Sequence, residues 1–193
     1  MRNRSSAFRA SHLPLAAMLL ICLLAPELAS SQQDLDGKPA NPFDAASGKL
    51  VVLVFLRRDC PVSSRYAPTI QQVSAQYERD ASFFLVFPDK AETPQTIHNY
   101  LRDYAYHLPA LRDPAHALVK LAQVQITPEV AVFNRNHQLL YAGRIDNWYL
   151  DLGRSRPAPT THELAGAIQA AIAGKTPPAN QVRGVGCYIS DLE

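Results

Sequence analysis

Apolar residues in this chain form short continuous runs separated by a segment with helical spacing. Residues 50–56 and 82–87 are runs rich in β-branched and aromatic side chains, which is typical of strands buried on both faces of a sheet. Between them, large apolar side chains recur at intervals of four, three and four residues over positions 63–79, and this spacing predicts an amphipathic helix. The pattern therefore predicts a strand–helix–strand unit in a mixed or parallel sheet.

The second half of the chain predicts two helices, two antiparallel strands and a final helix. Thr93 and Asp113, each followed by proline, are capping residues that open the two helices. Thr160 and Glu163 have the spacing of a capping box for the final helix. The strands cover residues 129–133 and 138–145, a turn at 134–137 separates them, and Gly174 follows the final helix. Together these elements predict an α/β fold with a central mixed sheet flanked by helices and a helical insertion before the third strand.

Residues 1–31 have the composition of an export signal. Three arginines precede an apolar run at 13–24, and small residues follow at 29–31. The apolar run is shorter than the roughly 20 residues of a transmembrane helix. We therefore expect an exported protein, periplasmic or secreted, with no membrane span after cleavage near Ala29, Ser30 or Ser31. The expected organisation is a signal peptide at 1–31, one domain at 32–175 and a C-terminal tail at 176–193.

The charge balance depends on this signal. Three of the 19 lysine and arginine residues and one of the 17 acidic residues lie in it, so the rest of the chain is neutral. A neutral chain without a block of like charges does not favour nucleic acid or an anionic membrane surface as a partner. The histidines do not recur at metal-ligand spacing, and we expect neither a metal nor a cofactor.

Two cysteines remain outside the signal, which contains Cys22. Cys60 follows the first buried strand and precedes the amphipathic helix, whereas Cys187 lies in the tail. Ser63 occupies the position at which a Cys-x-x-Cys motif has its second thiol, so dithiol chemistry within one turn is excluded. An even number of cysteines in an exported protein makes Cys60 and Cys187 candidates for one disulfide.

The order of elements, with a cysteine between the first core strand and its helix, resembles the thioredoxin-like superfamily. Two motifs carry the resemblance, Asp59-Cys60-Pro61-Val62-Ser63 at the strand-to-helix turn and Ile126-Thr127-Pro128-Glu129 before the third strand. Over about residues 50–175 the chain is more closely similar to exported redoxins related to the alkyl hydroperoxide reductase and thiol-specific antioxidant (peroxiredoxin-like) family. The resemblance implies a thioredoxin-like fold with a cis peptide bond before Pro128. It also implies that Thr127, Pro128 and Pro61 contact an extended substrate.

The chain departs from these relatives at several positions. Val54 stands where thioredoxins have a buried acid, and Arg57 stands where the peroxiredoxin motif has a threonine. Ser64 replaces the second cysteine in the Cys-x-x-x-Cys motif of copper-delivering relatives. The resemblance is therefore more specific for the fold than for the activity.

A thiol at the position of Cys60 has physical reasons to ionise. It lies at a helix N-terminus, where unpaired N–H groups and the helix dipole lower the pKa of a thiol. Ser63 is expected to hydrogen-bond the sulfur. Arg144, in the loop opposite, is a candidate to stabilise a thiolate or a bound peroxide, although a surface pair between Arg144 and Asp146 is equally compatible with the sequence.

Cys187 follows Gly184 and Gly186 in a proline-containing tail, and these small residues permit a close approach to the domain. Two roles stay open with equal weight. In the first, Cys187 is a resolving thiol that condenses with a sulfenic acid formed on Cys60. In the second, a permanent Cys60–Cys187 bridge stabilises the fold by roughly 4 to 5 kcal/mol on the chain-entropy model.

The sequence therefore predicts an exported thiol-dependent oxidoreductase of an antioxidant, peroxidase-like or disulfide-exchanging kind. The expected substrate is a peroxide or a protein disulfide, and an external thiol reductant restores the dithiol. The alternative from a different class is a noncatalytic thioredoxin-fold binding module with a structural disulfide, and a copper-handling protein is a more distant third hypothesis. The expected catalytic residues are Cys60, Cys187, Ser63 and Arg144.

Overall fold

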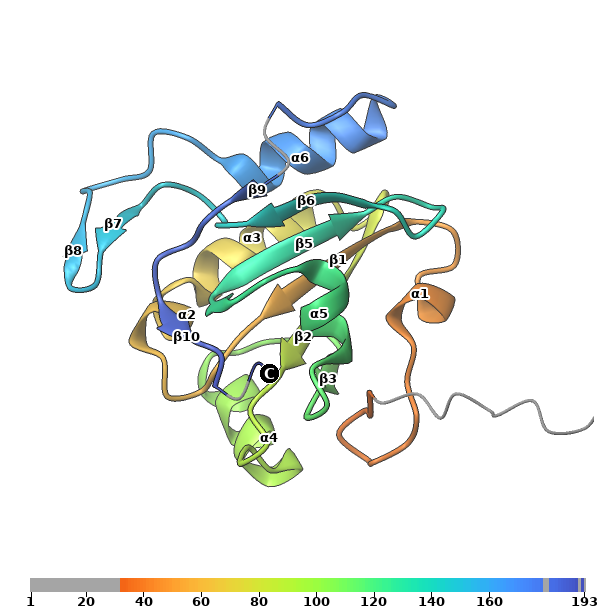
Figure 1. Cartoon of the computed structure of the whole chain (residues 1–193), viewed down its shortest axis with the longest axis vertical. Helices are drawn as coiled ribbons and strands as arrows, with labels where there is room; N and C mark the ends of the chain where they lie inside the picture. Colours follow the sequence, from red (N-terminus) through yellow and green to blue (C-terminus); the bar gives the residue numbers. More distant parts are fainter. Residues whose placement is uncertain (1–31, 179–180, 191, 193) are drawn as a thin grey trace, which may run out of the picture.

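The computed structural model describes residues 32–178, 181–190 and 192, so the predicted signal at 1–31 lies outside the described residues. Its centre is a six-stranded mixed sheet (Figure 1). The strand order is β3 (Ala110–Arg112), β2 (Ala81–Phe87), β1 (Leu50–Phe55), β5 (Glu129–Phe133), β6 (Leu139–Gly143) and β9 (Gln181–Val182). β1 is parallel to β2 and antiparallel to β5, β3 is parallel to β2, β6 is antiparallel to β5, and β9 is parallel to β6.

Helices cover both faces of this sheet, which confirms the predicted α/β class. One apolar core receives residues from α2 (Pro61–Arg65), α3 (Ala67–Gln76), α4 (Pro94–Asp103) and α6 (Glu163–Ile172), and the other from α1 (Pro42–Ala45) and α5 (Ala117–Ala122). In Figure 1, α5 lies on the near side of the sheet and α3 on the far side. Val52 and Val54 of β1 join the first core, and Val51 and Leu53 join the second. The apolar run of β1 is continuous because alternate residues of this strand pack into the two cores on opposite faces of the sheet.

The helix predicted at 63–79 is two helices. α2 and α3 are separated at Tyr66, and Pro68 lies in the first turn of α3. Proline has no backbone N–H for the preceding turn, and its ring clashes with that turn, so one continuous helix cannot pass through Pro68. Tyr66 and Ile70 remain buried in the predicted core. The break confines α2 to a short turn directly after Cys60.

The insertion between β2 and β5 contains strands as well as helices. It consists of α4, β3, α5 and the short strand β4 (Ile126–Thr127). The carboxylate of Asp113 accepts hydrogen bonds from the N–H groups of Ala117 at 2.9 Å and Val119 at 3.0 Å. Asp113 therefore caps α5 as predicted, but Pro114 precedes the helix instead of opening it.

The capping box predicted for α6 does not form. His162 is the N-cap residue, and the hydroxyl of Thr160 accepts a hydrogen bond from the Asn147 side chain at 2.7 Å. Gly174 follows the helix with a φ of 67°, in the left-handed region where glycine is favoured. Upstream of the helix, the strands β7 (Tyr149–Asp151) and β8 (Arg154–Ser155) form a separate two-stranded sheet.

The tail predicted at 176–193 pairs with the domain at two places. β9 lies against β6, and β10 (Cys187–Tyr188) lies antiparallel to β4. Figure 1 shows the tail passing from β9 along the end of the sheet to β10 beside α2. Gly143 permits the first pairing, because its φ is 138° and a Cβ there would overlap the carbonyl oxygen of Val182. The predicted reach of the tail back over the domain is confirmed.

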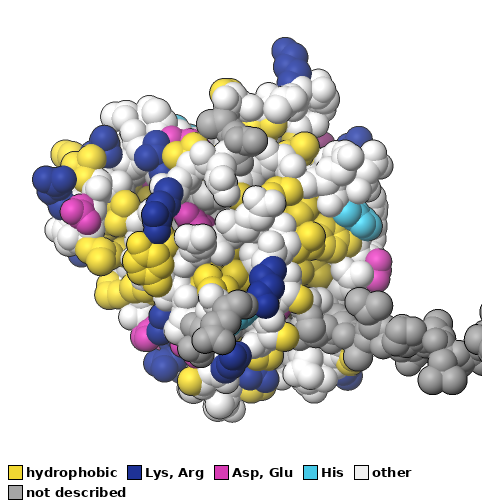
Figure 2. All heavy atoms as spheres, viewed as in Figure 1, with side chains coloured by type: hydrophobic (Ala, Val, Ile, Leu, Met, Phe, Trp, Pro, Cys, Tyr) yellow, Lys and Arg dark blue, Asp and Glu magenta, His cyan; other side chains and the backbone are white. Residues whose placement is uncertain are grey.

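Charged side chains form no continuous patch of one sign on the face shown in Figure 2, where lysine and arginine side chains are dispersed among polar and apolar ones. This distribution agrees with the neutral balance of the chain outside residues 1–31. None of the helices in the described part of the chain is long and apolar enough to cross a membrane.

Candidate functional site

Cys60 lies between the end of β1 and the start of α2, and its side chain is fully buried. Its thiol donates a hydrogen bond of 3.2 Å to the carbonyl oxygen of Thr127. The Thr127–Pro128 peptide bond is cis, as the resemblance predicted. The strand-to-helix turn and the cis-proline loop, far apart in sequence, therefore meet at the sulfur of Cys60.

Ser63 supports this sulfur from within the same turn. It is fully buried, and its backbone N–H and its hydroxyl both lower the pKa of the Cys60 thiol. The hydroxyl also accepts from the N–H of Arg57 at 3.5 Å. Ser63, in place of a second thiol, thus lies in the turn of Cys60 and favours its thiolate, and its catalytic role stays a prediction.

Cys187 approaches Cys60 from the tail. In the antiparallel pair of β10 and β4, Cys187 lies opposite Thr127. Gly186 makes this approach possible, because a Cβ at that position would overlap the carbonyl oxygen of Thr127. Both cysteines are free thiols, and Cys187 lowers the pKa of the Cys60 thiol. The two cysteines therefore meet at Thr127, one through its side chain and the other through strand pairing.

The two thiols differ in acidity. Burial raises the pKa of Cys60, but hydrogen bonds from Cys187 and Ser63 lower it, and the net pKa lies below the ordinary value of a cysteine. For Cys187, burial, the donated hydrogen bond and the charge on Cys60 raise the pKa to about 12. Cys60 therefore ionises first, and its thiolate holds the proton on Cys187.

Arg57 is the cation beside this pair. Its guanidinium donates to the carbonyl oxygen of Tyr188 at 2.9 Å and forms ion pairs with Asp59 at 2.9 Å and Asp89 at 3.3 Å. Its positive charge lowers the pKa of Cys187 against the larger effects that raise it. Arg57 thus connects the strand-to-helix turn to the tail.

Arg144 does not occupy the position considered from the sequence. Its guanidinium binds the carboxylate of Glu163 at the start of α6, with Nε donating over 3.0 Å. Asp146, its alternative predicted partner, accepts from the Tyr66 hydroxyl at 2.5 Å and the Trp148 N–H at 2.8 Å. The predicted pair between Arg144 and Asp146 is therefore wrong. Glu163 does not form the predicted capping box, and its carboxylate pairs with Arg144 instead.

Glu129 is a residue of the site that the sequence analysis missed. It is 5% exposed and directly follows Pro128. One carboxylate oxygen accepts from the N–H of Gly184 in the tail at 2.8 Å, and the other from the N–H groups of Gln125 at 3.1 Å and Ile126 at 3.4 Å. The signal in the sequence was a charged residue at the start of a strand that is otherwise apolar.

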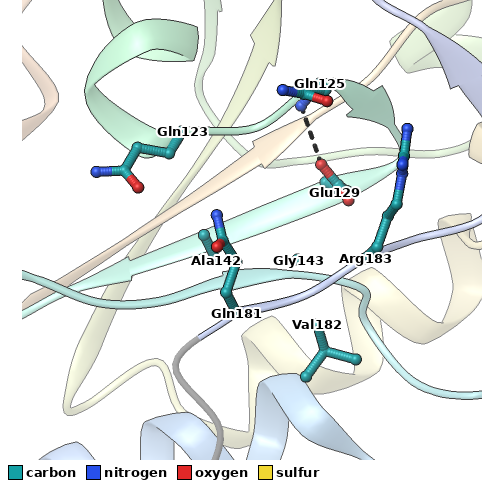
Figure 3. A pocket seen from close by; sticks show the side chains of 8 residues that line it. All are labelled: Gln123, Gln125, Glu129, Ala142, Gly143, Gln181, Val182 and Arg183. Carbon is teal, nitrogen blue, oxygen red and sulfur yellow. Dashed lines mark hydrogen bonds between the residues drawn. The ribbon is translucent and has the colours of Figure 1, made fainter.

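A cavity of about 350 Å³ lies beside Glu129 on the tail. Figure 3 shows the Glu129 carboxylate directed at the backbone of Gln125, with Arg183 extending from the tail next to it. The lining is mostly polar and consists of Gln123, Gln125, Glu129, Ala142, Gly143, Gln181, Val182 and Arg183. The cavity therefore borders the tail rather than the cysteine sulfurs.

Glu92 is a second buried acid that the sequence did not reveal. One of its carboxylate oxygens accepts from the N–H of Arg58 at 2.7 Å, and the other has no hydrogen-bond partner among the described residues. Burial raises the pKa of Glu92 to about 7, with the charges of Asp89 and Asp59 acting in the same direction. It lies in the segment after β2, where no periodic pattern marks a buried residue.

The remaining candidates surround the same turn. Thr127 and Pro128 are buried, and Pro61 is exposed as the first residue of α2. The backbone of Thr127, which we expected to contact a substrate, is paired with β10. Within the described ranges, no group of three or more histidine, cysteine, aspartate or glutamate residues is arranged to hold a metal ion.

Comparisons with known proteins agree with this geometry. Residues 48–139 match the sequence model of a family described as thioredoxin-like, and no curated protein matches the chain. A hypothetical protein from Sinorhizobium meliloti (TM-score 0.67) and an uncharacterized conserved protein from Geobacillus kaustophilus (TM-score 0.66) are each 20% identical over 81% of this chain and cover 87% and 85% of their own lengths. A secreted disulfide oxidoreductase from Mycobacterium tuberculosis is 19% identical, with a TM-score of 0.50 over 72% of this chain and 92% of its own. The fold is thioredoxin-like.

Proposed function

We propose that this protein is an exported thiol–disulfide oxidoreductase whose redox pair is Cys60 and Cys187. The observation that carries the proposal is that both free thiols lie at Thr127, next to the cis-proline. The Cys60 thiol donates to the Thr127 carbonyl oxygen at 3.2 Å, and Cys187 lies opposite Thr127 in the pairing of β10 with β4. A similar solved structure is described as a secreted disulfide oxidoreductase. The partner substrate is a disulfide, and an external thiol returns the pair to its reduced form.

The difference in acidity gives the order of steps. The Cys60 thiolate attacks one sulfur of the substrate disulfide, a Cys60–substrate disulfide forms, and the other substrate sulfur leaves as a thiolate. This step removes the negative charge on Cys60 that raises the pKa of Cys187. Cys187 then loses its proton and attacks the sulfur of Cys60, which forms the Cys60–Cys187 bond and releases the second substrate thiolate. Two electrons have passed from the protein dithiol to the substrate.

A peroxide is a second substrate class for the same pair. Cys60 is fully buried, and a small oxidant needs less space at a buried sulfur than a protein disulfide does. The Cys60 thiolate would take one oxygen atom from the peroxide to form a sulfenic acid and release an alcohol or water. Cys187 would then condense with the sulfenic acid, with loss of water, to give the same disulfide.

The experiment is to add a small disulfide to the reduced protein and to follow products by mass. The wild-type protein should form the intramolecular Cys60–Cys187 bond. The Cys187→Ser variant should stop at a mixed disulfide on Cys60, and the Cys60→Ser variant should react at least about a hundredfold more slowly, because it lacks the acidic thiol. Equal rates in the Cys60→Ser variant and the wild type would contradict the proposal.

The noncatalytic alternative is favoured by the complete burial of Cys60, which is typical of a structural cysteine. In that case Cys60 and Cys187 form a permanent bridge that supports a binding domain. Treatment of the oxidised native protein with dithiothreitol separates the two functions. An oxidoreductase should be reduced within minutes, whereas a structural bridge should persist until the protein is unfolded.

A further inference from the structure

The tail is bound to the domain through backbone hydrogen bonds and through the apolar side chains of Val182, Val185 and Ile189, which pack against the two cores. The N–H of Arg144 donates to the carbonyl oxygen of Val182 at 2.8 Å, the N–H of Gly184 donates to Glu129 at 2.8 Å, and the N–H of Ile189 donates to the carbonyl oxygen of Gln125 at 2.9 Å. Arg57 and the Thr127 hydroxyl bind two further tail carbonyl oxygens, those of Tyr188 at 2.9 Å and Cys187 at 3.3 Å. These contacts are available to any extended segment that runs in the same direction, which is the usual mode of strand addition to a sheet edge.

The tail also covers the reactive sulfur. Cys60 is fully buried, and Cys187, which lies over it, is partly exposed. Attack on a protein disulfide requires the attacking sulfur to lie in line with the disulfide bond, and the tail occupies the position from which a substrate would approach. A protein substrate therefore cannot reach Cys60 while β10 is in place.

Only a short stretch of the described tail holds this cover in position. β10 contains two residues, and the Tyr188 side chain is 64% exposed. Tyr188 contacts Arg183 of the tail itself, through a hydrogen bond of 2.7 Å to its hydroxyl and a guanidinium 5.5 Å from its ring centre. Displacement of residues 184–189 breaks their backbone hydrogen bonds and exposes Ile189, which is buried in the second core, but it leaves the six-stranded sheet intact.

We propose that residues 184–189 occupy the binding site of an extended, cysteine-containing segment of a partner protein, and that this segment displaces the tail. This inference rests on the proposed function. The partner's disulfide-bonded cysteine takes the place of Cys187 opposite Thr127. Cys60 attacks its sulfur, the Cys60–partner disulfide forms, and the second partner sulfur leaves as a thiolate.

The site sets a sequence requirement on the partner. A Cβ at Gly186 would overlap the carbonyl oxygen of Thr127 and lie 3.1 Å from the side chain of Ile126. The residue directly before the partner cysteine must therefore be glycine for the segment to pair with β4 in the register of the tail. Arg57 binds the carbonyl oxygen of the residue after the cysteine, whatever its side chain.

The test uses a synthetic peptide with the sequence of residues 181–190 as the partner. Its cysteine carries a thionitrobenzoate group in disulfide linkage, so that attack by Cys60 releases a coloured thiolate. A second peptide has alanine in place of the glycine before the cysteine. Three full-length proteins are compared, and all carry Cys187→Ser. The closed protein has no other change, and the opened protein also carries Gly186→Ala, which displaces the tail. The control protein instead carries Gly166→Ala, where a Cβ meets nothing within 4 Å.

The opened protein should capture the glycine peptide about tenfold faster than the closed and control proteins, because tail hydrogen bonds no longer compete. Each protein should prefer the glycine peptide over the alanine peptide by about tenfold. The peptide comparison can be made with the closed protein alone, so it tests the inference even if the Gly186→Ala variant does not fold.

Two results would overturn the inference. One is an equal rate of capture of the two peptides, and the other is an equal rate of capture by the opened and closed proteins. In both cases Cys60 must still react with dithionitrobenzoate. A different result would contradict the proposed function itself. If Cys60 reacts with neither peptide nor with dithionitrobenzoate in any folded form, it is not a redox-active thiol.

Discussion

The sulfur of Cys60 depends on two separate parts of the chain for its ionisation, the turn that contains Ser63 and the tail that contains Cys187. Ser63 could be predicted because it lies in the same turn, and Cys187 because it is the remaining cysteine outside the predicted signal. Glu129 and Glu92 could not, because their roles depend on backbone N–H groups of distant segments. Sequence patterns report which side chains are buried, but they do not report which backbone groups lie within hydrogen-bonding distance.

Replacement of Cys187 should change the pKa of Cys60. After burial, which raises this pKa, the largest effect is the hydrogen bond from the Cys187 thiol, which lowers it. Cys187→Ala should therefore raise the pKa of Cys60, whereas Cys187→Ser retains a donor and should raise it less. The pH dependence of Cys60 alkylation, located by mass, measures both. A lower pKa in the alanine variant would contradict the assigned hydrogen bond.

Glu92 should make the protein less stable at alkaline pH. Its pKa is raised in the folded protein to about 7, above that of the same side chain in the unfolded chain. The resulting contribution to stability is fully present below the pKa of the unfolded state, and it is lost as the pH rises through 7. Glu92→Gln should increase the free energy of unfolding by about 1 to 3 kcal/mol at pH 8 and by much less at pH 4. Urea unfolding at both pH values measures this difference.

The matched control is Glu78→Gln, since Glu78 is exposed. It should show no comparable dependence on pH. An equal gain in stability at both pH values for Glu92→Gln would indicate improved packing rather than the loss of a buried charge.

At the scale of secondary structure, the long apolar elements could be predicted and the shortest could not. β1, β2 and β5 have five to seven residues each, enough to show an apolar run. β4, β9 and β10 have two residues each, and no periodicity is visible over that length. Their positions are set by partner edges and by glycines that allow close approach, and the sequence showed the glycines near Cys187 but not the edge they approach.

Gly143→Ala should separate β9 from β6. The substitution places a Cβ against the carbonyl oxygen of Val182 at a φ of 138°, so both strain and overlap oppose it. Gly153→Ala is the matched control, with a φ of 77° but nothing within 4 Å of the added Cβ. The Gly143 variant should lose about 1 to 3 kcal/mol more in the free energy of unfolding than the control. Equal losses in chemical denaturation would show that β9 does not contribute to stability.

At the scale of the whole molecule, the order of strands and helices predicted the architecture. Connections between neighbouring elements follow few topologies, and the two motifs around Cys60 and Pro128 selected one of them. The order did not reveal that the insertion adds β3 to one edge of the sheet while the tail adds β9 to the other. Both edge strands of the central sheet thus come from segments outside the predicted strands.

Oxidation should stabilise the whole molecule. A Cys60–Cys187 bond closes a loop of more than 100 residues, which constrains the unfolded chain by about 4 to 5 kcal/mol on the chain-entropy model. The oxidised protein should therefore unfold at higher guanidinium concentration than the reduced protein, and a Cys60→Ser variant should not respond to oxidant. A lower stability on oxidation would indicate that the tail must be distorted to form the bond.

Because the tail belongs to the same chain, its concentration at the Thr127 edge does not depend on the protein concentration. A tethered segment of this kind competes at an effective concentration of the order of millimolar. A free peptide with equal affinity would have to reach that concentration to displace half of the tails. A folded partner that makes additional contacts elsewhere on the surface can displace the tail at far lower concentration, so tethering selects partners by the size of their interface as well as by their cysteine.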